Sequence, residues 1–377
     1  MNVLVVSGIW PPDVGGPASH APDVASFLQG RGHGVEVVTT ARGVPPRARY
    51  PVHWTSRELP KGILHLRAAA LIGRRAAAAD VVYTTGMFGR SFAGASAART
   101  PYVVKLTADP AFERARRRGE VGGTVDDFQH GGGGARAAAY RFARDIELRH
   151  AAHVITPSAW LQDLVLRWGV KPAHVEVLPN PTPPLPELRP RDRLRESFGL
   201  NGATLAFAGR LTVQKSLGVA LEALQEVDGV TLVIAGDGDE RAPLEQRASE
   251  LGLGDRVRFL GVQPRARIVE LFRAADASIL SSSWENFPHT VVEALAAGTP
   301  VLSTKTGGVA EVVRDGVNGL LVEPGNANAY AEMLRRFFGD ADLRDRLRAA
   351  AAPSVEEYAP ERILGRLEQV LQDAART

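Results

Sequence analysis

The sequence contains no cysteine, which excludes disulfide bonds, thiol nucleophiles and cysteine-ligated metals. It also contains no apolar run of the length that a membrane-spanning helix needs. Residues 1–7 are too short for a signal peptide and instead predict a buried first strand, so we expect a cytoplasmic protein. The formal net charge is only +3 and no nucleic-acid motif accompanies it, which gives little support for binding DNA or RNA.

The dinucleotide fingerprint G-x-G-x-x-G is also missing. The apolar run 3–6 predicts a strand, and a loop containing Gly15 and Gly16 leads into a helix over 18–29. This β–loop–α start lacks the glycine spacing of a nicotinamide site. A dinucleotide oxidoreductase is therefore disfavoured, and we expect no cofactor.

Predicted strands and helices alternate along the whole chain, which favours parallel α/β sheets, and 377 residues suffice for two domains. The stretch 179–186 contains five prolines and predicts a stiff, extended linker. We therefore expect one domain over 1–182 and a second over 190–352. Pro353 separates the second domain from a last helix predicted over 360–375.

A polar loop between two predicted strands carries the most informative residues. The strand 277–280 leads into this loop with Glu285, and Pro288 suits the first position of a helix that Gly298 can stop. Glu293 is expected about two turns into that helix. Because ligands collect at the carboxyl ends of parallel strands, the two carboxylates could hold different hydroxyls of one polar ligand.

Candidate phosphate-binding groups lie near this loop in the sequence. Thr306, Gly307 and Gly308 precede a short helix predicted over 309–314, and two glycines there leave backbone N–H groups bare. Arg210 and Lys215 follow a strand predicted over 204–208. Two cations between a strand and a helix suit an anionic group such as a phosphate, whereas as isolated residues they would more often be surface cations.

The pattern Glu285–x7–Glu293 followed by a glycine pair resembles the donor site of retaining glycosyltransferases of family 4, which have the GT-B fold. The resemblance implies two Rossmann-like parallel-sheet domains facing across a cleft, with the last helix crossing back so that 354–377 joins the first domain. It also implies a nucleotide-diphosphate sugar as co-substrate and phosphate binding without a metal. The implied donor-binding residues are Gly15, Gly16, Arg210, Lys215, Asn286, Phe287, Glu293, Thr306, Gly307, Gly308 and Val309, with Glu285 as a catalytic residue facing the sugar.

One departure from the family concerns the end of the strand predicted over 101–106. Thr107 and Ala108 stand where many members carry a histidine, and no histidine lies within twenty residues of Asp109. Asp109 is the nearest candidate for positioning the acceptor or taking its proton. An ordinary Asp-Pro turn explains this aspartate equally well.

The segment 111–134 is rich in arginine and glycine and predicts an irregular loop, which in this fold would receive the acceptor. Arg116 and Arg117 belong to a basic group over 114–118 and are the acceptor-side candidates. A solvated helix face would explain this group. A patch for an anionic acceptor, or for peripheral contact with an anionic membrane, is the other reading.

Several functions stay open. An inverting transferase or a nucleotide-sugar epimerase could use the same fold, and a non-catalytic sugar-nucleotide binder would share the site. Asp237 and Asp239 form the only Asp-x-Asp triplet at a fitting strand end, and they are read as a turn at the donor rim or as a metal site. Base, sugar and acceptor do not follow from the sequence.

Overall fold

The structure, a computed structural model, describes residues 1–13, 16–122, 124–182 and 184–376. The chain divides into two compact units, one formed by Met1–Pro179 with Leu364–Thr377 and the other by Asn180–Ile363. The sequence prediction placed the return to the first domain at residue 354. Here the division lies within the last helix, α16 (Pro360–Arg376).

The first unit is built on a parallel sheet of seven strands in the order β3-β2-β1-β4-β5-β6-β7. Its central strands are apolar and buried, as a sheet covered on both faces requires. The strands are β1 (Asn2–Ser7), β2 (Gly34–Ala41), β3 (Val52–Ser56), β4 (Val81–Thr84), β5 (Tyr102–Lys105), β6 (His153–Thr156) and β7 (Val175–Val177).

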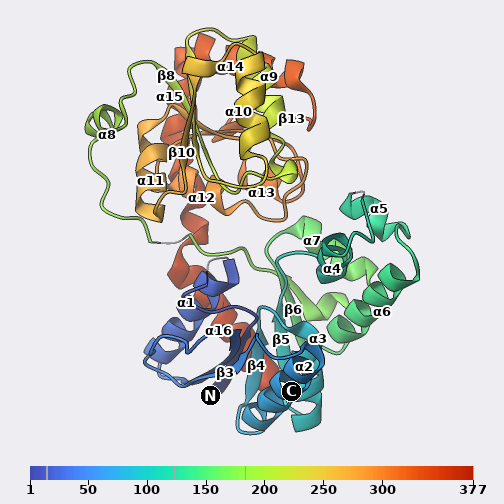
Figure 1. Cartoon of the computed structure of the whole chain (residues 1–377). Coiled ribbons are helices and arrows are strands. Elements are labelled where there is room, and N and C mark those ends of the chain that lie inside the picture. Colours follow the sequence, from blue (N-terminus) through green and yellow to red (C-terminus); the bar gives the residue numbers. More distant parts are fainter. Residues whose placement is uncertain (14–15, 123, 183, 377) are drawn as a thin grey trace. The chain divides into compact units, whose positions relative to one another are not determined.

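Helices cover both faces of this sheet: α2 and α3 lie on one side of its strands, and α1 and α16 on the other (Figure 1). The helices before α16 are α1 (Gly16–Gly30), α2 (Lys61–Ala76), α3 (Phe88–Ala98), α4 (Pro110–Arg117), α5 (Val125–Gln129), α6 (Ala135–Arg149) and α7 (Ala159–Arg167), with the short η1 (Pro172–His174). Glu368 of α16 accepts hydrogen bonds from Arg31 and His33, and Arg366 pairs with Glu176. The expectation that the last helix returns to the first domain is therefore confirmed.

The second unit has a parallel sheet of six strands in the order β10-β9-β8-β11-β12-β13. The strands are β8 (Ala203–Ala208), β9 (Val230–Ala235), β10 (Val257–Gly261), β11 (Ala277–Leu280), β12 (Val301–Thr304) and β13 (Gly319–Val322). One apolar core fills the space between sheet and helices. The predicted α/β class with two Rossmann-like sheets is confirmed.

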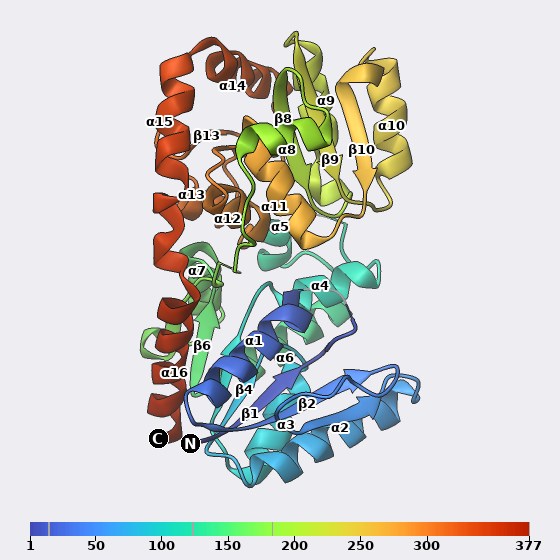
Figure 2. The same ribbon diagram turned by 90° about the vertical axis from the view of Figure 1, so that its left-hand side faces the viewer.

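The helices of the second unit form two layers. α9 packs with α10 and α14, and α11 packs with α8 and α12 (Figure 2). Their bounds are α8 (Arg191–Phe198), α9 (Leu217–Gln225), α10 (Arg241–Glu250), α11 (Arg265–Ala274), α12 (His289–Ala296), α13 (Val309–Val312), α14 (Ala327–Gly339) and α15 (Ala341–Ala351). Short turns of 3-10 helix are η2 (Val213–Lys215), η3 (Gly254–Arg256) and η4 (Pro353–Tyr358).

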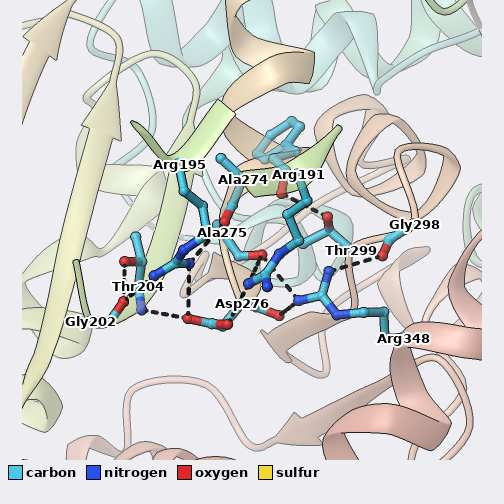
Figure 3. Close-up of polar contacts among 11 residues, drawn as sticks. Arg191, Arg195, Gly202, Thr204, Ala274, Ala275, Asp276, Gly298, Thr299 and Arg348 are labelled. Carbon is cyan, nitrogen blue, oxygen red and sulfur yellow. Dashed lines mark hydrogen bonds and ion pairs between the residues drawn. The ribbon is translucent and has the colours of Figure 1, made fainter. Parts of the chain in front are cut away.

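Arginines form hydrogen bonds to the amino-terminal ends of strands in the second sheet. The Asp276 carboxylate, just before β11, accepts from Arg191 Nη2 at 2.6 Å and from the Thr204 backbone N–H at 2.8 Å. Arg348 of α15 donates to the Asp276 carbonyl at 2.9 Å (Figure 3). Two helices are thus tied to the strand ends opposite the carboxyl edge, and a polar ligand at that edge does not compete for these contacts.

The segment 111–134 is not the continuous irregular loop that its composition predicts. It contains most of α4 and all of α5, and the preceding Asp109 caps α4 by accepting from the backbone N–H groups of Ala111 and Phe112. The composition misled the prediction because arginine and glycine obscure a short apolar face. Phe112 and Phe128 meet there edge to face and are buried.

Lys105, at the end of β5, is a buried cation in the core of the first unit. Its ammonium donates a hydrogen bond to the Leu178 carbonyl, and burial lowers the pKa of Lys105 to about 7, from an ordinary value of 10.5. The folded-state pKa is below the unfolded one, so the stability that this group contributes is present above pH 10.5 and is lost as pH falls towards 7.

We therefore expect Lys105→Met to change the pH dependence of folding. Between pH 7 and 9, the wild-type protein should gain up to about 1.4 kcal/mol per pH unit relative to this variant, because methionine cannot titrate. Urea unfolding of both proteins at the two pH values measures the difference. A difference independent of pH would contradict the lowered pKa.

Candidate functional site

The carboxyl ends of neighbouring strands β8, β11 and β12 bring three predicted loops together. Gln214, after β8, accepts from the Ser283 backbone N–H at 2.9 Å and donates to the Trp284 carbonyl at 2.9 Å. Ser281 Oγ donates to the Lys215 carbonyl at 2.9 Å. The loop that carries Glu285 is therefore fixed to the loop that carries Lys215.

Glu285 is a buried carboxylate held by two donors. Its Oε1 lies 2.5 Å from Lys215 Nζ and accepts from Ser282 Oγ at 2.7 Å. Thr304 of β12 in turn donates to the Ser282 carbonyl at 2.7 Å. Because Glu285 is only 7% exposed, the ion pair and the serine hydroxyl set the orientation of the carboxylate.

The glycine pair after β12 touches the backbone of Glu285. Gly307 has φ +47, and a Cβ at this position would lie 1.8 Å from the Glu285 carbonyl oxygen. The Gly308 N–H donates to that same oxygen at 3.2 Å. Gly307 is needed both for its left-handed backbone and for this close approach.

Thr306 adds an unsatisfied group beside the glycine pair. Thr306 is only 7% exposed. Among the described residues, its buried Oγ1 has no hydrogen-bond partner. A buried hydroxyl without a partner is costly unless a ligand or water pairs with it. Thr306 therefore marks a position where a polar ligand group would be stabilised.

Glu293 lies just over one turn into α12, nearer the helix start than predicted. The helix begins at His289, and Pro288 is its N-cap rather than its first residue. Glu293 Oε1 accepts from Arg265 Nε at 2.7 Å, and the Glu293 side chain is only 11% exposed. Arg265 is the first residue of α11, after β10, and the sequence analysis did not select it.

The family resemblance of the sequence implies that Glu293 binds a nucleotide, and on that expectation Arg265→Ala should weaken nucleotide binding. Without the arginine the carboxylate loses its fixed orientation, and the affinity should fall by about 1–2 kcal/mol, roughly 5- to 30-fold. Calorimetric titration with the nucleotide that raises the melting temperature most measures this loss, and Arg265→Lys should restore part of it. The matched control is Arg267→Ala on the same helix, which pairs with Glu270 and should bind the nucleotide as the wild type does. Equal affinity in Arg265→Ala would contradict this role.

The other predicted donor residues fall into different environments. Phe287 is buried, with its ring edge to face against Tyr358 and His289, and Val309 is fully buried in the core. Arg210 is exposed, and Asn286 is partly buried. Gly16 is the first residue of α1, whereas Gly15 lies outside the described residues. The short helix after Gly308 ends at Val312 rather than at residue 314.

Asp109, the predicted catalytic residue of the first unit, takes part in a buried network. Besides capping α4, its Oδ2 accepts from Arg144 Nη1 at 2.6 Å and from Gln129 Nε2 at 2.9 Å. The Arg144 guanidinium stacks 3.8 Å from the Trp168 ring centroid, and Trp168 Nε1 donates to Gln129 Oε1. Asp109 thereby connects α4, α5, α6 and the end of α7. Its catalytic role stays a prediction, and this structural role exists beside it.

The acceptor-side candidates Arg116 and Arg117 are exposed on the last turn of α4. Arg117 Nε donates to the Glu113 carbonyl at 3.2 Å. Their neighbours Arg114 and Arg118 both lie over the ring of Tyr140 on α6.

Metal-ligating side chains do not cluster in the described part of the chain: no group of three or more histidine or acidic residues could hold an ion there. Asp237 and Asp239 are exposed, and Asp237 Oδ2 lies 3.4 Å from Arg241 Nη1. None of the helices in the described ranges is long and apolar enough to cross a bilayer.

Both halves of the chain match family models. Residues 15–181 match the model described as glycosyl transferase 4-like domain, and residues 190–353 match the one described as glycosyl transferases group 1. Over 156 residues the chain is 36% identical to a lipopolysaccharide core biosynthesis glycosyltransferase of Rhizobium meliloti. That match covers 41% of this chain and 45% of the relative, so the chain spans less than half of the relative's length.

Two further similarities cover nearly the whole chain. An uncharacterized glycosyltransferase of Methanocaldococcus jannaschii is 27% identical, with 92% of this chain and 91% of the relative covered. The crystal structure of Anabaena HepE in complex with UDP superposes with a TM-score of 0.80 at 22% identity. It covers 99% of this chain and 100% of that one, and the fold is therefore shared throughout.

Proposed function

We propose that this chain, which consists of two glycosyltransferase domains, moves a sugar from a nucleoside-diphosphate sugar to an acceptor hydroxyl with retention of configuration. The observation that carries the proposal is the meeting of a cation, a carboxylate and an unpaired hydroxyl around one backbone segment. Lys215 and Thr306 both lie beside Glu285 at the carboxyl edge of the second sheet. This combination suits a ligand that carries both phosphate and sugar hydroxyls.

In the proposed donor complex, Lys215 exchanges its partner. Its ammonium, now paired with Glu285, would turn to the diphosphate, and Arg210 would add a second positive charge. Glu285 is then free to face the sugar, with Ser282 still holding one of its oxygens. Glu293, oriented by Arg265, would accept hydrogen bonds from the ribose.

Retention of configuration would follow if the acceptor attacks and the diphosphate departs on the same face of the sugar. The acceptor oxygen forms its bond to the anomeric carbon as the bond from that carbon to the diphosphate breaks. The acceptor proton passes to an oxygen of the departing diphosphate, so no protein base is required. Positive charge develops at the anomeric carbon, and the negative Glu285 carboxylate would stabilise it.

The proposal places the protein in family 4, with phosphate binding by side chains rather than by a metal. Asp237 is exposed and already lies beside an arginine, so it is poorly suited to bind a metal cation. This supports phosphate binding without a metal. We further propose a cytoplasmic enzyme whose acceptor is a small molecule, a glycan or a lipid-linked acceptor. UDP, the nucleotide in the Anabaena complex, is the first nucleotide to test.

Two measurements test the proposal. A thermal-shift panel of UDP-, GDP-, ADP- and dTDP-linked sugars should show one nucleotide that stabilises the protein. With that donor and an accepted acceptor, proton NMR of the product should show the anomeric configuration of the donor. Inverted product would assign the inverting class, conversion of the donor without acceptor would assign an epimerase, and binding without any reaction would assign a non-catalytic binder.

A further inference from the structure

An apolar stripe on α2 points away from the core of the first unit. Ile63 and Leu66 are 46% and 74% exposed, although both are large aliphatic residues. At helical spacing they share one side with Ala70, Arg67 and Arg74, all exposed. The buried side of α2 lies opposite and consists of Ala68, Ile72 and Ala76. The stripe is therefore a second apolar surface, separate from the one that folds the helix onto the sheet.

Positive charge surrounds this stripe. Lys61 starts α2, α3 packs against α2 and carries Arg90, and Arg114 projects from α4. Burial and the charges of Arg90, Arg114 and Lys61 lower the pKa of His65, which shows that cations from three helices act at one position on α2. We call the surface formed by the exposed residues Lys61, Ile63, Leu66, Arg67, Arg74 and Arg114 the α2–α4 face.

The Glu147 carboxylate faces one cation of this face, Arg114, whose charge opposes the rise that burial gives the pKa of Glu147. Among the described residues, no ion pair joins any of its lysine or arginine side chains to a carboxylate. Arg75, on the other side of α2, does pair with Glu36. Exposed cations beside exposed aliphatic side chains are the composition of a helix that lies on an anionic bilayer, with the apolar residues entering the headgroup boundary.

We propose that the α2–α4 face docks the protein on an anionic lipid surface, with Ile63 and Leu66 entering the interface and the arginines contacting the lipid phosphates. A nucleic acid fits this surface less well, because bases are bound by stacking on aromatic rings and the stripe is aliphatic. The nearest ring, Tyr140, is already covered by the guanidinium groups of Arg114 and Arg118. Docking requires no catalysis, so it is measured separately from sugar transfer.

Co-sedimentation of the full chain with vesicles tests the proposal. Binding is expected to vesicles of phosphatidylcholine with phosphatidylglycerol, to fall as salt is raised, and to be absent with phosphatidylcholine alone. Leu66→Glu should lower the vesicle affinity by more than about tenfold, and Arg67→Ser by about fivefold. Because both positions are exposed, thermal unfolding should match the wild type.

Val262→Glu is the matched control, since Val262 is 77% exposed but belongs to the second unit. It should bind vesicles as the wild type does. Equal loss in Val262→Glu and Leu66→Glu, or wild-type binding by Leu66→Glu, would overturn the proposal. So would a wild-type dimer in solution that Leu66→Glu converts to a monomer while neither protein binds lipid, because the stripe would then contact a second copy.

Discussion

Glu285→Gln should lower turnover by about 100- to 1000-fold while the protein stays folded and continues to bind nucleotide. Glutamine keeps the shape of the side chain and can still accept from Ser282. It removes the negative charge that the proposed function places beside the anomeric carbon. It also releases Lys215 from its ion pair, which frees the cation for the diphosphate. The loss is therefore expected in kcat rather than in the affinity for UDP.

Steady-state release of the nucleoside diphosphate, measured with a fixed acceptor, gives kcat, and calorimetric titration of the nucleotide gives its affinity. Glu332→Gln is the control, since Glu332 is an exposed residue of α14 in the same unit and should leave turnover unchanged. Wild-type turnover in Glu285→Gln would remove this carboxylate from the reaction. A purely structural role would instead appear as a lower melting temperature and weaker UDP binding together.

Arg144→Ala should destabilise the protein by about 3–5 kcal/mol. The side chains of Arg144 and Asp109 are 3% and 1% exposed, so truncating the arginine leaves an unpaired carboxylate in the core. The stacking contact with Trp168 is lost as well. Urea unfolding measures the change. Arg136→Ala, on the same helix, removes an exposed pair with Glu120 and should cost less than about 0.5 kcal/mol.

Asp109→Asn separates the two roles of the aspartate. If Asp109 mainly orders α4 and α5, the variant should lose stability, and its remaining folded fraction should transfer sugar at a near-normal rate. If Asp109 positions the acceptor or takes its proton, turnover should fall even where the protein is fully folded. Equal stability of Arg144→Ala and Arg136→Ala would contradict the structural role altogether.

Elements with a continuous apolar pattern were predictable from the sequence. β11 has the bounds that its run predicts, because a strand buried on both faces is apolar throughout and ends where polar loops begin. α4 and α5 were missed because they depend on a network that joins Asp109, Gln129 and Arg144 across the fold. Strand β3 and helix α2 had no such run and were not anticipated.

In the candidate site too, residues marked by a local pattern were predictable and contacts between distant residues were not. Glu285, Glu293 and the glycine pair could be selected because their spacing along the chain is short and specific. Their pairings could not: Lys215 was selected only as a phosphate ligand and is 70 residues from Glu285, and Arg265, 28 residues from Glu293, was not selected. Ser282 was visible only as one of three consecutive serines. Pairing of this kind is decided by which strand ends are neighbours in the sheet, and a single sequence does not state that.

The central claim is that the carboxyl edge of the second sheet binds a nucleoside diphosphate without a metal. Calorimetric titration of UDP into the wild type and into Glu293→Gln, both in the presence of EDTA, tests it most directly. The account predicts binding by the wild type and an affinity lower by about 1–3 kcal/mol in Glu293→Gln, because a charged hydrogen bond to the ribose is lost. Equal affinity in the two proteins, or binding by the wild type only after magnesium or manganese is added, would contradict it.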